Sequence, residues 1–299
     1  MTLKQENLIL SLIGSEPDGL KPIEIHKLLF MLEKLDSSMN VYEFIPYKRG
    51  CYSPTLSHDL HKLESEGYIK TVTMSTDASV WRLTEKGRIK SFSARITGRR
   101  IVQFRHLYPL RGKALVVDVY KRYPYWAINS IIRDLILRDD PEALKSIQEA
   151  CPTTKVPLAS IGYEGRSIED YINSLIKSGI SVLCDVRKNP ISRRYGFSKS
   201  TLGEICKGCG IEYRHYPQLG ISSCERQDLK CQSDYDSLFL RYERDILPFA
   251  QKELDEISNL VKSGCGVALT CFEASPAQCH RTRVLNAIND RIGVLAKLI

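Results

Sequence analysis

The sequence predicts an α/β protein in two parts: a Rossmann-like parallel sheet domain at residues 158–299, preceded by a winged-helix and helical domain. From residue 158 onward, short apolar runs alternate with amphipathic helical segments, which is typical of a doubly wound parallel sheet. Residues 1–90 instead contain three helical segments followed by two alternating runs. With 299 residues, the chain is long enough for each part to bury its own core.

Composition favours a reduced, soluble protein. Hydrophobic residues make up 43% of the chain and charged residues 26%. No run approaches the ~18 apolar residues of a membrane span, and the N-terminus does not resemble a signal peptide. We therefore expect a cytoplasmic protein with no membrane partner. All cysteines except Cys51 lie from Cys151 onward in a chain too long for a small disulfide scaffold, so reduced thiols are expected.

Three helices and a hairpin are expected in residues 1–90. Apolar residues recur at helical spacing in three segments: Leu3–Ile13, Pro22–Leu35 and Ser53–Glu66. Two alternating runs follow at residues 68–72 and 80–84, with a polar turn at Ser75-Thr76-Asp77 between them. This order predicts a winged helix, in which the third helix enters the major groove of DNA.

The outward face of that third helix, with the loop before it, carries the expected DNA contacts. Basic side chains meet phosphates, and polar side chains on a recognition helix meet base edges. The expected contacts are Lys48, Arg49, Thr55, Ser57, His58, His61 and Lys62. The alternative is a module for protein contact or dimerisation, in which the two histidines are merely solvated.

Residues 91–150 are interpreted as a basic helical connector, within a segment expected to be helical from Gly87 to Ala150. Most of the +8 net charge lies in the first 155 residues, and arginines are interleaved here with tyrosines and Trp126. This combination suits phosphate contact and base stacking. The alternative is a solvated connector whose tyrosines pack on a neighbouring domain. Residues 151–157 are the expected linker.

The second part is expected to alternate strands and helices. Four apolar runs are expected to be strands: Leu158–Tyr163, Ile180–Cys184, Ile211–Tyr216 and Gly266–Cys271. Helices are expected between them at Ser167–Gly179, Ser200–Lys207 and Tyr235–Lys262. Ser275, Pro276 and Gln278 have the spacing of an N-cap, a first-position proline and a capping box, so a last helix is expected to begin there.

Polar residues follow these strands at the edge where parallel strands end. In an open parallel sheet, ligands bind outside the carboxyl ends of the strands. Asp185 and Arg187 follow one strand, while Cys271 and Glu273 end another. The same edge also collects Tyr163, Glu164, His215 and Tyr216. The sequence therefore predicts a ligand site at this edge.

Three stretches carry a family resemblance: residues 161–202, the GIEYRHYPQLG segment and LTCFEASPAQCHR. In order and type they resemble the family catalogued as domain of unknown function 488, over about the C-terminal half of the chain. The resemblance implies a Rossmann-like domain, mostly prokaryotic, of largely unassigned activity, associated with modified nucleic acids and phage defence. The first half is similar to a winged-helix module fused to such domains.

Several enzyme classes are excluded by missing motifs. The chain has no Walker phosphate loop, dinucleotide GxGxxG, HExxH or GxSxG motif, which excludes P-loop nucleotide hydrolases, dehydrogenases, zincins and α/β-hydrolases. A zinc or iron–sulfur site is one alternative, with irregular spacing of its ligands Cys206, Cys209, Cys224 and Cys231. The prediction is that no metal or other cofactor is used.

The carboxylates favour cleavage of an N-glycosidic bond. Together with the winged helix, the resemblance implies a DNA glycosylase that excises a modified base from duplex DNA, in defence against phage. Cleavage of an N-glycosidic bond passes through an oxocarbenium-like state that a carboxylate stabilises. The expected catalytic residues are Asp185, Glu273, Arg187 and Tyr163. The expected substrate and phosphate contacts are Arg193, Arg194, His215, Tyr216, Cys271, His280 and Arg281.

Two other functions remain open. One is a transcriptional regulator whose α/β domain only binds a small effector. The other is an enzyme that depends on Cys271, because a strand that ends in cysteine before a loop and a helix resembles rhodanese-like sulfurtransferases.

Overall fold

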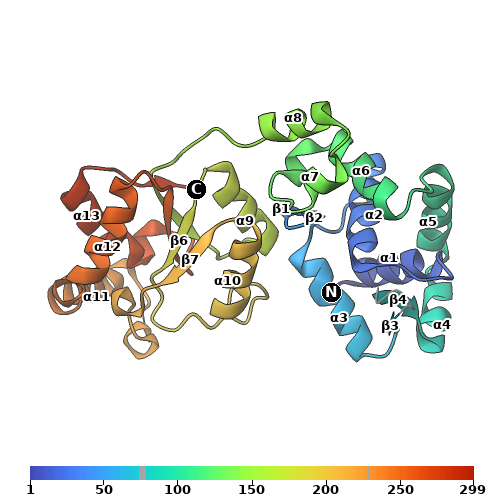
Figure 1. Ribbon diagram of the computed structural model, residues 1–299. Coiled ribbons are helices and arrows are strands. Elements are labelled where there is room, and N and C mark those ends of the chain that lie inside the picture. Colours follow the sequence, from blue (N-terminus) through green and yellow to red (C-terminus); the bar gives the residue numbers. More distant parts are fainter. Residues whose placement is uncertain (74–78, 228) are drawn as a thin grey trace. The chain divides into compact units, whose positions relative to one another are not determined.

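A computed structural model of the protein describes residues 1–73, 79–227 and 229–299. They form two compact units, Met1–Cys151 and Pro152–Ile299 (Figure 1). The turn expected at Ser75-Thr76-Asp77 lies outside the described residues. None of the described helices combines the length and the apolar character that crossing a membrane requires.

The first unit begins with three helices and two hairpins. Its elements are α1 (Leu3–Gly14), α2 (Pro22–Leu35), η1 (Ser37–Met39), β1 (Ile45–Tyr47), β2 (Gly50–Tyr52), α3 (Pro54–Ser65), β3 (Ile69–Thr73) and β4 (Ser79–Leu83). Thr2 and Gln5 form a capping box on α1, and Ser53 caps α3 ahead of Pro54. The three expected helices are thus present, whereas the hairpin of β1 and β2 was not expected.

The rest of this unit is a series of short helices that share the same core. They are α4 (Glu85–Ser93), α5 (Arg95–Leu107), α6 (Gly112–Arg122), η2 (Pro124–Ala127), α7 (Arg133–Ile136) and α8 (Pro141–Glu149). The expectation of helix throughout was wrong, because Pro109 and Pro124 lie at interruptions of the helical hydrogen bonding. Ile101, Tyr108 and Tyr120 join the hydrophobic core built by α1 to α3. This segment is therefore part of one compact unit and not a separate connector.

The second unit contains a parallel sheet, as predicted, in the strand order β7-β6-β8-β5-β9, and its fifth strand, β9, was not expected. Its elements are β5 (Leu158–Gly162), α9 (Ile168–Lys177), β6 (Val182–Asp185), α10 (Lys199–Gly208), β7 (Glu212–His215), η3 (Pro217–Leu219), η4 (Ser223–Arg226), α11 (Gln232–Asp245), η5 (Leu247–Phe249), α12 (Gln251–Lys262), β8 (Val267–Cys271), η6 (Pro276–Gln278), α13 (Arg281–Ile292) and β9 (Lys297–Leu298).

Two helices differ from the expected ones. The helix expected over Tyr235–Lys262 is broken into α11 and α12 around Pro248, because proline cannot continue the helical hydrogen bonding. The last helix begins at Arg281 instead of Ser275. Ser275 makes no side-chain cap, and the extended backbone of Cys279 separates a single 3₁₀ turn from α13.

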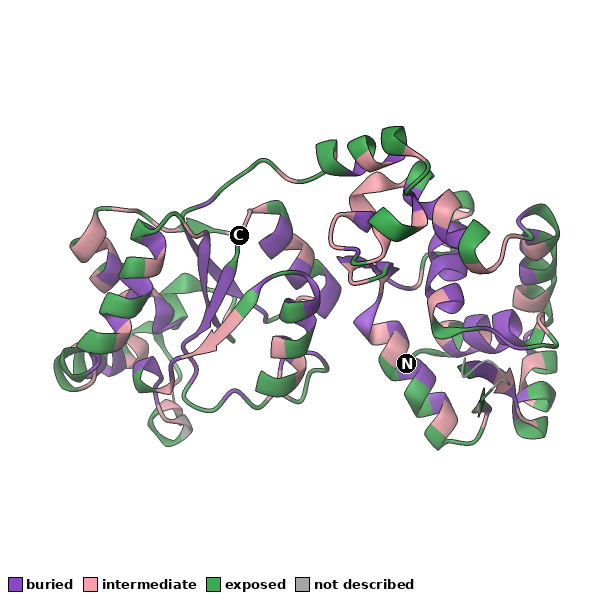
Figure 2. Cartoon of the chain, in the orientation of Figure 1, coloured by how far each residue is buried: buried purple, intermediate pink, exposed green. Residues whose placement is uncertain are grey.

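Helices cover both faces of the sheet, and this arrangement places the site. In Figure 1, α9 and α10 lie on one face, and α11, α12 and α13 lie on the other. All residues of β5, β6 and β8 are buried between these layers (Figure 2). The chain leaves β8 toward one face and leaves its neighbours β5 and β6 toward the other. Such a switch point opens a crevice at the carboxyl ends of the strands.

Candidate functional site

A crevice of about 520 Å³ lies at this switch point. Its walls come from the residues that follow β5, β6 and β8, and from the segment around η4. Four cationic side chains line it: Arg187, Lys188, Arg193 and Arg226. The crevice is therefore suited to an anionic ligand.

Asp185 is completely buried and saturated with hydrogen bonds. Its Oδ1 accepts from the Arg187 backbone N–H (3.1 Å) and Nε (2.8 Å), while Oδ2 accepts from Arg187 Nη2 (2.5 Å) and Tyr213 Oη (2.6 Å). Burial lowers the pKa of Arg187, but hydrogen bonding to Asp185 outweighs it and raises this pKa above its usual range. Asp185 does not line the crevice, so the expected pairing of Asp185 with Glu273 at one substrate is not formed.

Arg187 and Tyr163 form one wall of the crevice. Arg187 Nη1 donates to Tyr163 Oη and to the carbonyl oxygen of Phe197, both at 2.9 Å. The Tyr163 ring stacks on Phe197 with centroids 4.4 Å apart and planes 10° apart. Because this ring face is covered, Tyr163 aligns Arg187 and does not offer that face to an extruded base.

Glu273 lies in the crevice wall with 13% of its side chain exposed. Arg226 Nη1 donates to its Oε1, and Cys271 Sγ donates to its Oε2 at 3.1 Å. Arg281 Nη1 donates to the backbone carbonyl oxygen of Glu273 at 2.7 Å and does not pair with the carboxylate. The carboxylate is therefore held by Arg226, which comes from η4, far from Glu273 in the sequence.

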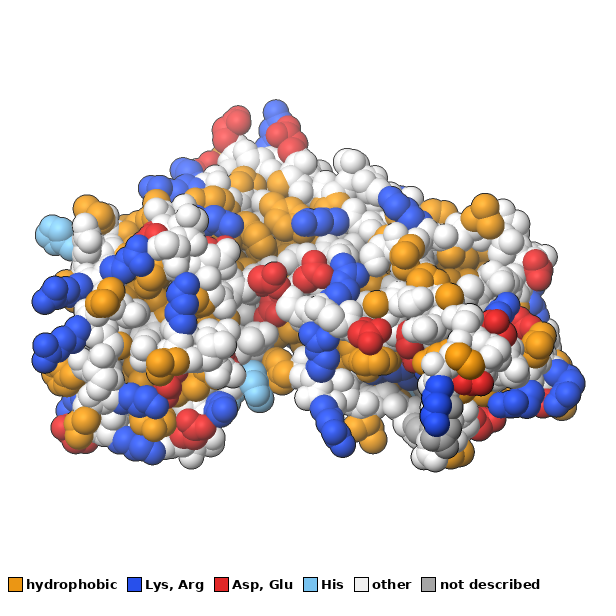
Figure 3. Space-filling model, turned by 180° about the vertical axis from the view of Figure 1, so that it is seen from behind, with side chains coloured by type: hydrophobic (Ala, Val, Ile, Leu, Met, Phe, Trp, Pro, Cys, Tyr) orange, Lys and Arg blue, Asp and Glu red, His pale blue; other side chains and the backbone are white. Residues whose placement is uncertain are grey.

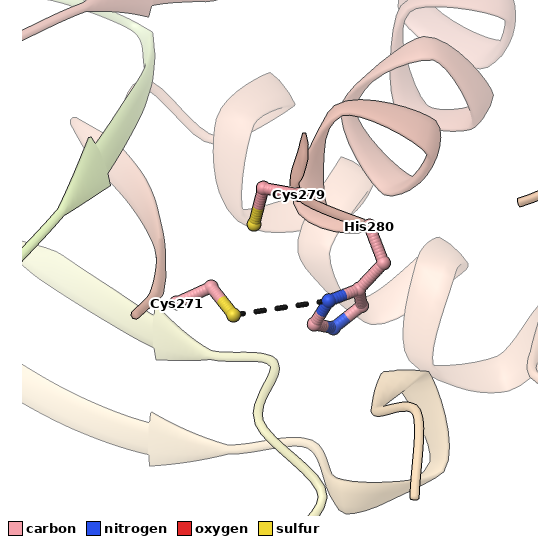
Figure 4. Close-up of side chains that lie close together, drawn as sticks. All are labelled: Cys271, Cys279 and His280. Carbon is pink, nitrogen blue, oxygen red and sulfur yellow. Dashed lines mark hydrogen bonds between the residues drawn. The ribbon is translucent and has the colours of Figure 1, made fainter. Parts of the chain in front are cut away.

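Beside Glu273, three side chains converge at the end of β8 and the start of α13: Cys271, Cys279 and His280 (Figure 4). Cys271 Sγ lies 3.7 Å from His280 Nδ1. The other ring nitrogen, Nε2, lies 2.9 Å from the carbonyl oxygen of Val186, which can only accept a hydrogen bond. The proton therefore sits on Nε2, and the Nδ1 lone pair faces Cys271 and Arg226, whose Nη2 donates to it at 2.9 Å.

The pKa values of the two thiols in this cluster are shifted in opposite directions. The pKa of Cys271 lies well below its usual value. The main cause is a hydrogen bond from Cys279, to which the nearby His280 and Arg226 add, and together they outweigh burial, which would raise this pKa. Burial, with the hydrogen bond to Cys271, raises the pKa of Cys279 well above its usual value. The thiolate therefore forms on Cys271 first, and Cys279 stays protonated and donates a hydrogen bond to it.

Arg281 is an internal cation of the same cluster. Its side chain is wholly buried, donates from Nε to Ser160 Oγ (2.7 Å) and from Nη1 to Cys279 Sγ (3.3 Å), and leaves Nη2 without a partner. None of the ion pairs in the described parts of the chain includes Arg281. The expectation that Arg281 contacts phosphate is wrong, because the residue does not reach the crevice.

The other expected substrate contacts divide between the crevice and the sheet edge. Arg193 is exposed and lines the crevice. Arg194 lies outside it and donates to the carbonyl oxygens of Tyr163 and Arg166. His215 and Tyr216 also lie outside it, because β7 is an edge strand and β6 separates it from β8. His215 Nε2 contacts the Arg187 carbonyl oxygen at 2.9 Å.

Several lining residues were missed from the sequence, and three of them bear on ligand binding. Arg226 belongs to a segment interpreted only as a polar loop, and no local signal marked it. Lys188 adds a further cation to the crevice. Phe272 is 42% exposed, and its place between Cys271 and Glu273 in an otherwise polar run gave no sign of a ligand contact.

In the first unit, the expected DNA-contacting residues group around α3. His58, His61 and Lys62 are exposed, as is Arg49, while Lys48, Thr55 and Ser57 are half-buried. Lys48, Arg49 and Ser57 line one cavity of about 340 Å³. Ser57 Oγ also contacts the buried His26 Nε2 at 3.2 Å, so part of its role is structural.

A second basic surface lies over α4 and α5. A groove of about 950 Å³ is lined there by Arg82, Arg88, Arg95, Arg99 and His106, among others. Lys and Arg side chains gather on this end of the first unit in Figure 3. The exposed Phe92 and Val102 lie between these cations, so the groove is both basic and apolar.

The alternative cysteine site of the sequence analysis is not assembled. Cys206 and Cys209 are buried, whereas Cys224 and Cys231 are exposed. In the described ranges, the metal-ligand cluster is Cys271, Cys279 and His280, which includes none of these four.

Comparison with known proteins bears on the second unit. The family model described as domain of unknown function DUF488 matches residues 167–288. The second unit is thus similar to that family, as its motifs suggested, and the matched range of this DUF488-like unit includes Arg187, Arg226, Glu273 and the cysteine–histidine cluster. No curated protein and no solved structure matches the chain.

Proposed function

We propose that the DUF488-like unit is a hydrolase that acts on a nucleotide unit of DNA and releases a modified base by cleaving its N-glycosidic bond. The observation that carries this proposal is the position of Glu273, a carboxylate in the wall of a crevice lined by four cationic side chains. Phosphate groups fit these cations, and the exposed ring of Phe272 offers a stacking surface for a base.

Glu273 is the acid–base residue of this reaction. Water adds to the sugar carbon, the bond to the base breaks, Glu273 accepts the proton of the water, and the departing base is protonated from solvent. The ion pair with Arg226 fixes the orientation of the carboxylate. Asp185 acts as a positioning residue, since it holds Arg187 in the crevice wall.

Glu164 is the second carboxylate that lines the crevice. Its Oε2 accepts a hydrogen bond from the backbone N–H of Ala274 at 2.9 Å, which ties the residues after β5 to the loop that carries Glu273. In this proposal Glu164 replaces Asp185 as the partner carboxylate.

The first unit is proposed to be a winged-helix module that holds the DNA. In support, α1, α2 and α3 precede the hairpin of β3 and β4, and Leu20, between α1 and α2, forms an isolated antiparallel bridge with Trp81 of β4. The exposed face of α3 presents His58, His61 and Lys62. Defence against phage is the proposed setting, because phage genomes are a source of modified bases.

Base release tests the proposal directly. Purified protein is incubated with duplex DNA that carries ordinary or phage-type modified cytosines, and abasic sites and free base are measured. We expect release that falls by at least about a hundredfold in Glu273→Gln. The matched control is Asp255→Asn, an exposed carboxylate on α12, which is expected to keep the full rate. No release from any substrate, with DNA binding retained, would favour an effector-binding regulator.

A second candidate function is a thiol-dependent transferase. The observation that favours it is the arrangement of Cys271, His280 and the Val186 carbonyl, which matches a nucleophile, its base and the group that orients the base. This function requires Cys271, so Cys271→Ser would abolish it and iodoacetamide would inactivate the wild type. Full base release by Cys271→Ser would exclude a nucleophilic thiol.

A further inference from the structure

We propose that Cys271, Cys279 and His280 bind a zinc ion at the floor of the crevice. Two thiols and an imidazole nitrogen form the ligand set, and all three side chains are buried, with ligand atoms within 4.8 Å of one another (Figure 4). Sulfur and imidazole ligands together select zinc among the common divalent ions, in preference to magnesium or calcium.

The spacing of these atoms fits a tetrahedral ion. With bonds of ~2.3 Å to sulfur and ~2.0 Å to nitrogen, neighbouring ligand atoms of a tetrahedral zinc site lie about 3.5–3.8 Å apart. The distance between Cys271 Sγ and His280 Nδ1 is 3.7 Å. Because the three ligand atoms lie within 4.8 Å of one another, their side chains need to draw together to enclose the ion.

The surroundings of the cluster also match those of a metal site. A ligating histidine ordinarily donates its other ring N–H to a carbonyl or carboxylate, which fixes the tautomer. His280 does this through Nε2 to Val186, so that Nδ1 is the ring nitrogen that carries the lone pair for a metal. Arg281 Nη1 donates to Cys279 Sγ, and this buried cation makes no ion pair with a carboxylate in the described residues.

Zinc binding requires Arg226 to give up its hydrogen bond to His280. Its Nη2 occupies the Nδ1 lone pair of His280 in the structure, so the ion replaces this hydrogen bond. Arg226 keeps its ion pair with Glu273 through Nη1. Each thiol that still carries a proton releases it to solvent as its bond to zinc forms, so affinity rises with pH.

This placement gives the ion access to substrate. Cys271 and His280 line the crevice, whereas Cys279 is wholly buried beneath them. Three protein ligands leave a fourth position for water, whose acidity the ion increases, and Glu273 lies next to Cys271 to accept the proton. This catalytic role rests on the proposed function, but zinc binding itself does not.

Metal binding is measured first, without any substrate. Metal-free full-length protein is titrated with zinc against a competing chelator, and with cobalt as a spectroscopic substitute. We expect one ion per chain and a sulfur-to-cobalt charge-transfer band. Folded wild-type protein that binds neither ion would overturn the proposal.

Variants then locate the ion. Cys271→Ser, Cys279→Ser and His280→Ala are expected to lose stoichiometric binding, while Cys231→Ser, an exposed cysteine outside the cluster, is expected to keep it. Loss of the ion in Cys231→Ser alone would overturn the assignment. Arg226→Gln is expected to bind zinc about tenfold more tightly, because the ion no longer displaces a charged hydrogen bond.

A further measurement uses only the wild type, so it tests zinc binding even if the ligand variants do not fold. Alkylation with iodoacetamide is followed residue by residue by mass spectrometry, with and without zinc. Zinc is expected to slow the alkylation of Cys271 and to leave the exposed Cys224 and Cys231 unaffected. Equal alkylation of Cys271 with and without zinc would contradict the proposal.

Product analysis separates this proposal from the proposed function. Base release that persists unchanged in chelated protein would overturn the catalytic role of zinc and leave the glycosylase intact. Free ammonia without free base would support the zinc site and overturn the glycosylase, because zinc-bound hydroxide beside a glutamate also deaminates bases. Glu273→Gln is expected to retain zinc and lose turnover.

Discussion

Asp185 and Arg187, two residues apart at the end of β6, form a bidentate ion pair behind the crevice wall. The pair leaves Arg187 Nη1 to hold Tyr163 and Phe197. Because the carboxylate oxygens are occupied and fully buried, Asp185 cannot take a proton from a substrate or a water in the crevice. Its contribution to function is the position of Arg187.

Removing one partner of this pair is expected to destabilise the fold strongly. Asp185→Asn leaves the Arg187 guanidinium buried without its counter-charge, which costs about 3–5 kcal/mol of unfolding free energy. Urea unfolding measures the loss. Asp255→Asn removes an exposed ion pair instead and is expected to cost less than about 1 kcal/mol. An Asp185→Asn protein as stable as the wild type would contradict this prediction.

Gly162 is expected to tolerate no side chain. A Cβ there would lie 2.0 Å from the carbonyl oxygen of Glu273, so β5 and the loop after β8 would separate. We expect Gly162→Ala to lose about 1–3 kcal/mol of stability and most base release. Gly203→Ala, in α10, meets its nearest side chain at 3.5 Å and is expected to be neutral or stabilising. Equal behaviour of the two variants in thermal unfolding would contradict this close approach.

Stability is expected to fall with acid because of His26. Burial, followed by the nearby charge of Lys27, lowers the pKa of His26 from 6.5 to about 3. Between these values the unfolded chain binds a proton that the folded chain does not, so the folded state loses about 1.4 kcal/mol per pH unit as the pH falls from 6.5 toward 3. Above pH 6.5 this contribution is fully present.

His26→Asn is expected to remove that slope, while His106→Asn, at an exposed position, keeps it. Urea unfolding at several values between pH 4 and pH 7 gives the comparison, and the carboxylates that titrate in the same range are common to all three proteins. Parallel curves for wild type and His26→Asn would show that His26 does not carry the effect.

Lys62 on α3 is expected to contribute a phosphate contact. Lys62→Ala is expected to weaken duplex DNA binding and to reduce the slope of log affinity against log salt by about 1. Lys145→Ala, on α8, removes the same charge from an exposed helix outside the proposed DNA-binding face and serves as the control. Fluorescence anisotropy at several salt concentrations distinguishes them. Identical slopes would exclude α3 as the DNA contact.

The sequence by itself determined the helices α1 to α3 and the alternation of β5 to β8 with helices, because these follow from local periodicity and caps, but it did not indicate the β1–β2 hairpin or β9. The apolar runs at β5, β6 and β8 and the capping residue Ser53 are local signals of this kind. Local patterns also placed Cys271 and Glu273 at the end of a strand, where ligands bind. The break of α12 from α11 and the late start of α13 depend on Pro248 and Cys279, which the periodicity does not resolve.

Only the tertiary structure decided which of the polar residues share a site. The strand order puts β8 between β6 and β5, so the crevice collects Arg187 and Glu273 while His215, on the edge strand, is left outside. Long-range packing also brings Arg226 onto Glu273 and seals Asp185 behind Arg187. Periodicity specifies which face a side chain occupies but not which strands become neighbours, since that choice depends on burying both faces of the sheet at once.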